Sequence, residues 1–175
     1  MKLKKYLYNS VTSTNDIAIK KINQGILSGI IIAKKQTKGR GRYGNKWISF
    51  KNNLFMSVFF NLDSKTSLNK LTFTTCKLIQ KSLFKLLKKK IIIKKPNDLL
   101  INKKKLCGIL QETIFYRNKK FAIIGIGINV DRSPIIVNYP TTYVNFYTKK
   151  KLTSTKIYNE IKKNFENYLK RKICI

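Results

Sequence analysis

The sequence predicts a mixed α/β (α+β) fold, in which helices pack against a largely antiparallel sheet. Short β-branched segments recur along the chain, two long segments carry the apolar spacing of amphipathic helices, and tight turns separate the strands of the second half. The 175 residues match the length of about one domain, and a hydrophobic content of 43% is sufficient for a buried core. We therefore expect residues 1–175 to form a single domain.

The first third of the chain predicts a strand, a helix and a second strand. Residues 6–11 have the composition of a strand, and the Ser, Thr and Asn at 13–15 are capping candidates for the helix that follows. Gly25 is expected to end this helix. A β-branched strand over residues 29–35 then leads into a glycine-rich loop.

The middle of the chain predicts a strand, a long helix and another strand. Residues 53–62 have the composition of a strand, and residues 67–90 keep an apolar stripe at helical spacing. This stripe predicts an amphipathic helix that packs on the sheet. Residues 91–95 then return to a strand.

The second half of the chain predicts antiparallel hairpins followed by a terminal helix. Strand-like segments alternate there with short polar turns. The expected strands are residues 98–101, 106–115 and 121–130, with turns at 102–105 and 116–120. After an irregular stretch at 131–151, apolar spacing predicts a helix over residues 154–172, with Ser154 as its cap.

The strongly basic composition is interpreted as surface rather than as a ligand site. A net charge of +31, from 38 Lys and Arg against 7 Asp and Glu, ordinarily suggests a polyanionic partner. Only five of these cations are arginines, and the chain is rich in Lys, Ile and Asn together, as an A/T-biased coding sequence produces without selection. Most lysines are therefore expected to be solvated, and a basic nucleic-acid-binding module remains an alternative.

Several classes of site and location are excluded by what the sequence lacks. It contains no histidine, so an imidazole base or a His-ligated metal is excluded. The cysteines at 76, 107 and 174 have no metal-ligand spacing, their odd number fits a reducing compartment, and Cys107 is expected in the core. No apolar run reaches the roughly 18 residues of a membrane span, and no signal peptide is recognisable. We expect a cytoplasmic protein.

The segment TKGRGRYGNKW, residues 37–47, is the first candidate site. Its glycines allow close backbone approach, and its two arginines suit phosphate or carboxylate oxygens. It does not fit a P-loop, because Asn45, Lys46 and Trp47 follow the last glycine instead of Lys and Ser or Thr. An anion-binding loop is the prediction, and a basic surface turn is the alternative.

Two further segments carry polar groups or glycines at strand positions. Within residues 94–110, Asp98 is one of seven acids and is expected either to position a metal-bound phosphate or an ammonium group, or to neutralise the surface. Lys105 enters an apolar strand, as edge protection or as an anion ligand. The segment GIGIN at 125–129 does not fit a dinucleotide-binding fingerprint, and its glycines indicate close approach of another group to the strand.

These segments occur in an order that resembles a known family. The motifs STN, GRGRYGNKW, KKPND with KLCGIL, and GIGIN, within about residues 8–170, are similar to the catalytic domain of bacterial biotin protein ligases. The resemblance implies the biotin/lipoate ligase fold, which is related to class II aminoacyl-tRNA synthetases. It implies an ATP-dependent ligase that uses biotin, ATP and Mg²⁺ to make biotinyl-5′-AMP and transfers biotin to the biotin carboxyl carrier protein of acetyl-CoA carboxylase.

The resemblance also implies roles for individual residues and assigns none as a metal ligand. The implied biotin contacts are Ser13, Thr14, Asn15, Gln36, Arg40, Gly41, Arg42, Lys105 and Gly108. The implied ATP contacts are Gly39, Arg40, Trp47, Lys94, Asn97 and Asn129. The implied catalytic residues are Arg42, Lys105 and Asp98. Asp98 is further expected to orient the acceptor lysine.

Some features depart from the family pattern and leave alternatives open. Tyr43 and Asn45 replace a second arginine pair, and Lys95 replaces an aromatic residue, so weaker loop closure and nucleotide affinity are expected. The C-terminal β-barrel and N-terminal winged-helix domains of the family are not recognisable, so a ligase without operator binding is expected. A lipoate or octanoate ligase and a degenerate biotin-binding enzyme are the alternatives. Exposed sheet edges leave a homodimer open.

Overall fold

A seven-stranded mixed sheet forms the centre of the structure, a computed structural model that describes residues 2–63 and 66–173. The strands are β1 (Lys5–Val11), β2 (Ser28–Gln36), β3 (Leu54–Asn61), β4 (Ile92–Lys94), β5 (Asp98–Ile101), β6 (Lys104–Tyr116) and β7 (Lys119–Ile128). Their order in the sheet is β1-β2-β3-β7-β6-β5-β4. Among these strands β1 and β2 pair in parallel and the other neighbours are antiparallel, which confirms the predicted largely antiparallel sheet.

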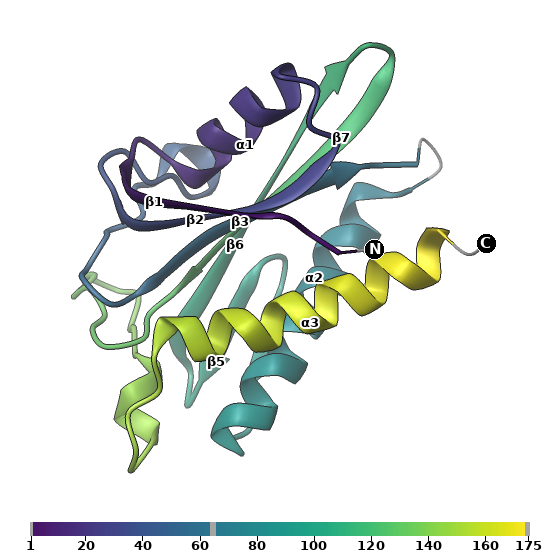
Figure 1. Cartoon of the computed structure of the whole chain (residues 1–175). Coiled ribbons are helices and arrows are strands. Elements are labelled where there is room, and N and C mark those ends of the chain that lie inside the picture. Colours follow the sequence, from purple (N-terminus) through teal and green to yellow (C-terminus); the bar gives the residue numbers. More distant parts are fainter. Residues whose placement is uncertain (1, 64–65, 174–175) are drawn as a thin grey trace.

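Helices cover both faces of this sheet. They are α1 (Thr14–Asn23), α2 (Leu68–Leu87) and α3 (Ser154–Ile173), with 3-10 turns at Arg42–Gly44 and Val144–Tyr147. Figure 1 shows α1 on one face and α2 and α3 on the other. The predicted helix at 67–90 ends earlier than expected, because Lys88 adopts a left-handed conformation with φ of 53°. The predicted cap Ser154 is wrong by one residue, since Thr153 Oγ1 accepts a hydrogen bond from Lys156 N.

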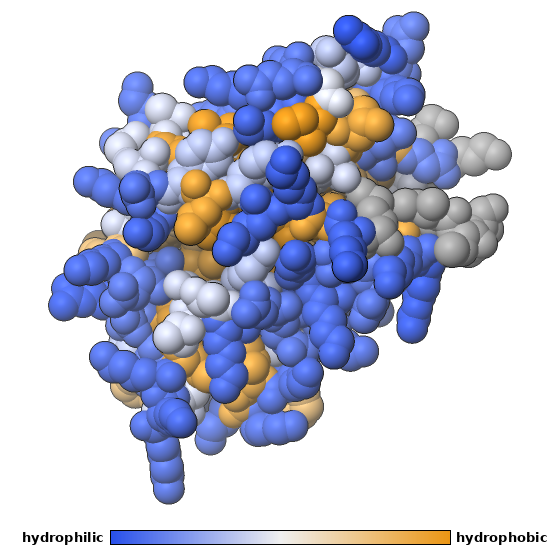
Figure 2. Space-filling model, viewed as in Figure 1, coloured by the Kyte–Doolittle hydropathy of each residue, from blue (hydrophilic) through white to orange (hydrophobic). Residues whose placement is uncertain are grey.

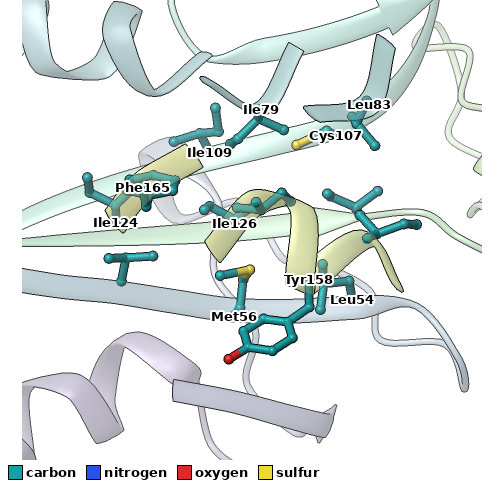
Figure 3. Packing of buried hydrophobic residues seen from close by; sticks show 14 of the residues in the cluster. Leu54, Met56, Ile79, Leu83, Cys107, Ile109, Ile124, Ile126, Tyr158 and Phe165 are labelled. Atoms are coloured by element: carbon teal, nitrogen blue, oxygen red, sulfur yellow. The ribbon is translucent and has the colours of Figure 1, made fainter. Parts of the chain in front are cut away.

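The larger core lies between the sheet and the pair α2 and α3. Residues of β3 and β7 alternate in direction, and every second residue from Leu54 and from Ala122 faces this core. The helices contribute Ile79, Leu83, Tyr158 and Phe165, as Figure 3 shows. Cys107 is fully buried in this cluster, which confirms the expectation of a core residue, whereas Cys174 lies outside the described residues.

A smaller core lies between the sheet and α1. It includes Phe59 from β3 and Phe121 and Ile123 from β7, packed on Ala18 and Ile22 of α1. Farther along the same face of β7, the apolar side chains are replaced by two glycines, at 125 and 127. This face is therefore hollow at the N-terminal end of α1, and the candidate site lies there.

Two tight hairpins connect the strands of the second half, as predicted. Asn102 and Lys103 join β5 to β6, and Arg117 and Asn118 join β6 to β7, all four with positive φ. Two consecutive residues of positive φ match the twist of antiparallel strands. The β6–β7 turn leads to a register in which Gly108 of β6 pairs with Gly127 of β7.

One face of the molecule shows a mostly hydrophilic surface (Figure 2). In the view of Figure 2, polar and charged side chains cover most of the surface and hydrophobic ones are scattered between them. Among the described helices, none has the length and apolar composition needed to cross a membrane.

Candidate active site

A cavity of about 680 Å³ opens on the α1 face of the sheet. Its walls are the start of α1, the loop at 39–47, the strands β6 and β7, and the segment at 134–141. This volume lies within the range of about 300–1,000 Å³ that small-molecule sites occupy. Two of the sequence-predicted residues, Gly39 and Lys94, do not line the cavity, and all the others do.

One end of the cavity is a buried network of hydrogen bonds. Gln36 Oε1 accepts hydrogen bonds from the backbone N (2.8 Å) and the hydroxyl (3.1 Å) of Thr14. Ser57 Oγ lies 2.7 Å from Thr14 Oγ1 and 2.5 Å from Asn15 Oδ1. Ser13 caps α1 by accepting a hydrogen bond from Asn15 N. The fold therefore brings the STN motif together with Gln36 and presents amide and hydroxyl groups in a nearly dry environment.

Ser57 was not predicted from the sequence. It is fully buried in β3, where its neighbours on both sides are apolar. A single hydroxyl within the run LFMSVFF was the signal available, because a buried serine requires hydrogen-bond partners.

Gly125 allows this polar end to form. A Cβ atom at position 125 would lie 2.6 Å from Asn15 Oδ1, which is closer than any ordinary contact. Asn15 Nδ2 donates a 2.5 Å hydrogen bond to Glu112 Oε2 on β6. The first glycine of GIGIN thus makes room for Asn15, as the predicted close approach to this strand required.

The loop at 39–47 is an ordered hairpin. Trp47 N donates to Gly39 O at 2.9 Å, and Gly41 N donates to Asn45 O at 2.6 Å. Tyr43 occupies the left-handed region with φ of 55°, and its exposed hydroxyl accepts a 2.7 Å hydrogen bond from Arg42 Nη2. The Arg42 guanidinium also lies over the Tyr43 ring, 4.7 Å from its centroid. The residue that departs from the family pattern therefore holds Arg42 at the cavity wall.

Arg40 makes a different set of contacts. Its guanidinium pairs with Asp16 of α1 at 2.6 Å and with Glu112 of β6 at 3.3 Å. These ion pairs fasten the hairpin to the sheet and the helix. Glu112 was not predicted from the sequence, where it reads as the polar face of a strand. The implied contacts of Arg40 with biotin and ATP stay predictions.

Trp47 lies flat on two aligned glycines. A Cβ atom at Gly108 would lie 2.7 Å from Trp47 Cζ3, and one at Gly127 would lie 2.6 Å from Trp47 Cζ2. The indole Nε1 is buried and has no hydrogen-bond partner among the described residues. Gly108 of KLCGIL and Gly127 of GIGIN, which are distant in sequence, therefore both leave room for the Trp47 ring.

The cationic end of the cavity centres on Lys105. Its ammonium lies 3.0 Å from Asp98 Oδ1, and both side chains are largely buried. The other oxygen of Asp98 accepts a 2.5 Å hydrogen bond from the hydroxyl of Tyr139. Burial raises the pKa of the Tyr139 phenol well above its usual value, and the hydrogen bond to Asp98 raises it further. Tyr139 was not predicted, because it lies in the irregular stretch at 131–151.

The two asparagines with implied ATP contacts brace the backbone in this structure. Asn97 Nδ2 donates to Ile109 O at 2.7 Å, and Asn129 Nδ2 donates to Thr142 O at 3.1 Å. Lys94 lies over the Tyr139 ring, 4.4 Å from its centroid. The described residues contain no group of three or more His, Cys, Asp and Glu side chains that would hold a metal ion.

Comparison with known proteins gives a family model and several curated relatives. The model of the biotin/lipoate A/B protein ligase family matches residues 7–129. The bifunctional ligase/repressor BirA of Bacillus subtilis is 36% identical over 135 residues, which are 73% of this chain and 41% of that protein. Biotin–protein ligase 2 of Arabidopsis thaliana is 29% identical over 171 residues, which are 90% of this chain and 50% of that protein. The chain thus spans half or less of the length of these two curated relatives.

Solved structures show the same relationship. The biotin protein ligase of Leishmania major in complex with biotinyl-5-AMP has a TM-score of 0.81 at 26% identity, covering 92% of this chain and 72% of that chain. The biotin protein ligase of Aquifex aeolicus in complex with biotin and ATP has a TM-score of 0.80 at 28% identity, covering 96% and 71%. These similarities confirm the expected biotin/lipoate ligase fold. Because the family model also matches well over half of the chain, the protein belongs to the biotin/lipoate A/B protein ligase family.

Proposed function

We propose that the protein is an ATP-dependent biotin–protein ligase whose acceptor is the biotin carboxyl carrier protein of acetyl-CoA carboxylase. The observation that carries this proposal is one cavity with a hydrogen-bonding end at Thr14 and Asn15 and a cationic end at Lys105, with Arg42 also on its wall. Biotin has the same two ends, a ureido ring and a carboxylate. The relatives named as biotin protein ligases support the proposal. Residues 1–175 are taken to act as one catalytic domain.

The chemistry of the buried end favours biotin over lipoate or octanoate. A ureido group offers N–H donors and a carbonyl acceptor, which can pair with the amides and hydroxyls around Thr14, Asn15 and Ser57. A dithiolane ring or an alkyl chain offers neither. Each donor or acceptor position of this network that a ligand shields from water and leaves unpaired costs about 1–3 kcal/mol. Such a site therefore discriminates against the acyl groups of the alternative ligases.

In the first half-reaction, a biotin carboxylate oxygen attacks the α-phosphorus of ATP and pyrophosphate leaves. Two anions must approach each other, so the protein's contribution is positive charge and alignment. Lys105 and Arg42 are the proposed ligands of the biotin carboxylate and the α-phosphate. The proposed ATP contacts are Gly39, Arg40, Trp47, Lys94, Asn97 and Asn129.

Mg²⁺ is proposed to enter with the ATP phosphates. Asp98 is the one acidic residue among the described residues that line the cavity. Magnesium in nucleotide sites is commonly held by phosphates, waters and one or two carboxylates. Asp98 therefore fits a residue beside a magnesium-bound phosphate, where the ion supplies neutralising charge.

In the second half-reaction, the amine of the acceptor lysine attacks the carbonyl carbon of biotinyl-5′-AMP and AMP leaves. The acceptor has an ordinary pKa of about 10.4 and must lose a proton before it attacks. Asp98 is proposed to orient this group. Asp98→Asn is expected to slow transfer to the carrier more than adenylate formation, and equal losses in the two half-reactions would contradict this role.

The proposal is tested by two assays on the same protein. Biotin-dependent exchange of pyrophosphate into ATP measures the first step, and biotin transfer to a purified carrier domain measures the second. Arg42→Ala is expected to lower both rates by about 10- to 150-fold, because hydrogen bonds to charged groups contribute about 1.5–3 kcal/mol. Arg117→Ala is the matched control, since Arg117 lies in the β6–β7 turn over the Tyr116 ring.

Two results would overturn the proposal. Exchange that depends on lipoate instead of biotin would identify the alternative ligase. Full activity of Arg42→Ala in both assays would show that the cationic end is not the reacting site.

A gel shift with sequence-specific DNA would contradict a separate expectation, the lack of operator binding.

A further inference from the structure

The segment after β7 is fixed against the start of β6. Lys105 N donates to Pro140 O at 2.8 Å, and Thr142 N donates to Lys105 O at 2.8 Å, so Thr141 lies beside Lys105 like a short parallel strand. Thr141 Oγ1 also donates to Pro134 O, which closes the segment on itself. Residues 134–142 lack regular secondary structure. Backbone hydrogen bonds to Lys105 nevertheless hold them in place.

This arrangement places Tyr139 against three charged groups. Its hydroxyl donates to Asp98 Oδ2 at 2.5 Å, and its ring centroid lies 4.4 Å from Lys94 Nζ and 5.3 Å from Lys105 Nζ. The Lys105 ammonium lies at a similar distance, 5.4 Å, from the ring of Trp47. The ammonium is thus in contact with two aromatic rings and one carboxylate, all belonging to different segments of the chain.

We propose that Tyr139 is a positioning residue for adenylate formation, which acts by fixing Asp98 and, through it, Lys105. This inference rests on the proposed ligase function. A lysine side chain has many rotamers, so an unrestrained ammonium is poorly aligned with a reacting phosphate. Tyr139 restrains it in two ways, with a charge-assisted hydrogen bond to its carboxylate partner and with the face of its ring.

The hydroxyl has a separate function from the ring. Without it, Asp98 Oδ2 loses its hydrogen-bond donor in a half-buried site, and the carboxylate is free to turn toward Lys105 with both oxygens. The ammonium would then lose its fixed position beside Asp98 Oδ1. Biotin affinity is expected to change little, because the ureido-binding end at Thr14 and Asn15 lies at the other end of the cavity.

The test uses the full chain with Tyr139→Phe, which removes the hydroxyl and keeps the ring. In biotin-dependent pyrophosphate exchange, kcat is expected to fall about tenfold, equivalent to about 1.4 kcal/mol, while KM for biotin stays within about twofold. Tyr143→Phe, one residue after this segment and packed edge-on against Phe146, is the matched control and is expected to keep the wild-type kcat. Thermal unfolding of each variant reports on its folding.

A double-mutant cycle separates positioning from general stability. If Tyr139 acts through Asp98, adding Tyr139→Phe to Asp98→Ala should lower kcat by less than twofold further. A tenfold further fall, or a wild-type kcat in the single variant, would refute the inference. Absence of exchange in the wild-type protein would instead refute the proposed function, and this inference with it.

Discussion

Gly125 and Gly127 lie two residues apart on the same face of β7, and we predict that replacing each by alanine disturbs a different part of the cavity. A Cβ atom at 127 would lie 2.6 Å from Trp47 Cζ2, and one at 125 would lie 2.6 Å from Asn15 Oδ1. Contacts between non-bonded carbon atoms ordinarily begin at about 3.5 Å, so each substitution must displace its neighbour by roughly 1 Å. Overpacking of this kind costs about 1–3 kcal/mol.

The two displaced side chains report differently. Trp47 is the only tryptophan of the chain, so fluorescence excited at wavelengths beyond the tyrosine absorption band reports on it alone. Gly127→Ala is expected to lift the indole from the sheet, to shift its emission to longer wavelength and to raise KM for ATP. Gly125→Ala is expected to leave the emission unchanged and to weaken biotin binding by about 5- to 150-fold, the equivalent of about 1–3 kcal/mol.

Fluorescence spectra and calorimetric titration with biotin measure these effects on the same samples. Each variant serves as the control for the other, because both add one methyl group to the same strand. Unchanged emission in Gly127→Ala would mean that the indole does not rest on β7. An equal emission shift in both variants would show a general loss of packing instead of two local contacts.

Three further predictions concern other residues. Ser57→Ala removes a buried hydroxyl between Thr14 and Asn15 and is expected to weaken biotin binding by about 1–3 kcal/mol, measured by titration; unchanged affinity would argue against a role for this network. Burial, and after it the hydrogen bond to Asp98, raises the pKa of Tyr139 in the folded protein, so the wild type should lose more unfolding free energy than Tyr139→Phe as pH rises above about 10, in urea titrations at two pH values; parallel losses would contradict the raised pKa. Burial, with a smaller effect of Asp98, raises the pKa of Cys76 to about 11, so iodoacetamide at pH 8 should modify it only after unfolding; rapid labelling of the native protein would count against its burial.

The order and type of the elements could be predicted because periodicity is local. The stripe at 67–90 and the β-branched runs identify their elements without knowledge of their neighbours. The sequence indicates that another group approaches the backbone closely at Gly108 and Gly127. It does not show that this group is the same side chain for both. That Trp47 lies on both depends on the register between β6 and β7, which the sequence does not display.

The residues that sequence reasoning missed are those whose function arises from long-range contacts. Tyr139 meets Asp98, 41 positions earlier, because backbone hydrogen bonds hold its segment against Lys105. The sequence predicts that Arg40 binds an anionic ligand. In the structure its guanidinium pairs with the carboxylates of Asp16 and Glu112, the latter 72 positions away. Local composition suggests what these side chains can bind, and the fold decides which partner is within reach.

The residues that stabilise the fold and the residues that form the cavity lie largely on opposite faces of the sheet. Most of the buried apolar residues lie under α2 and α3, whereas the cavity occupies the α1 face. Variants of polar lining residues that abolish turnover should therefore leave the larger core intact, which makes the scaffold suitable for directed evolution toward other acyl groups. Drift in the cavity lining can accumulate while the opposite core keeps the chain above its stability threshold.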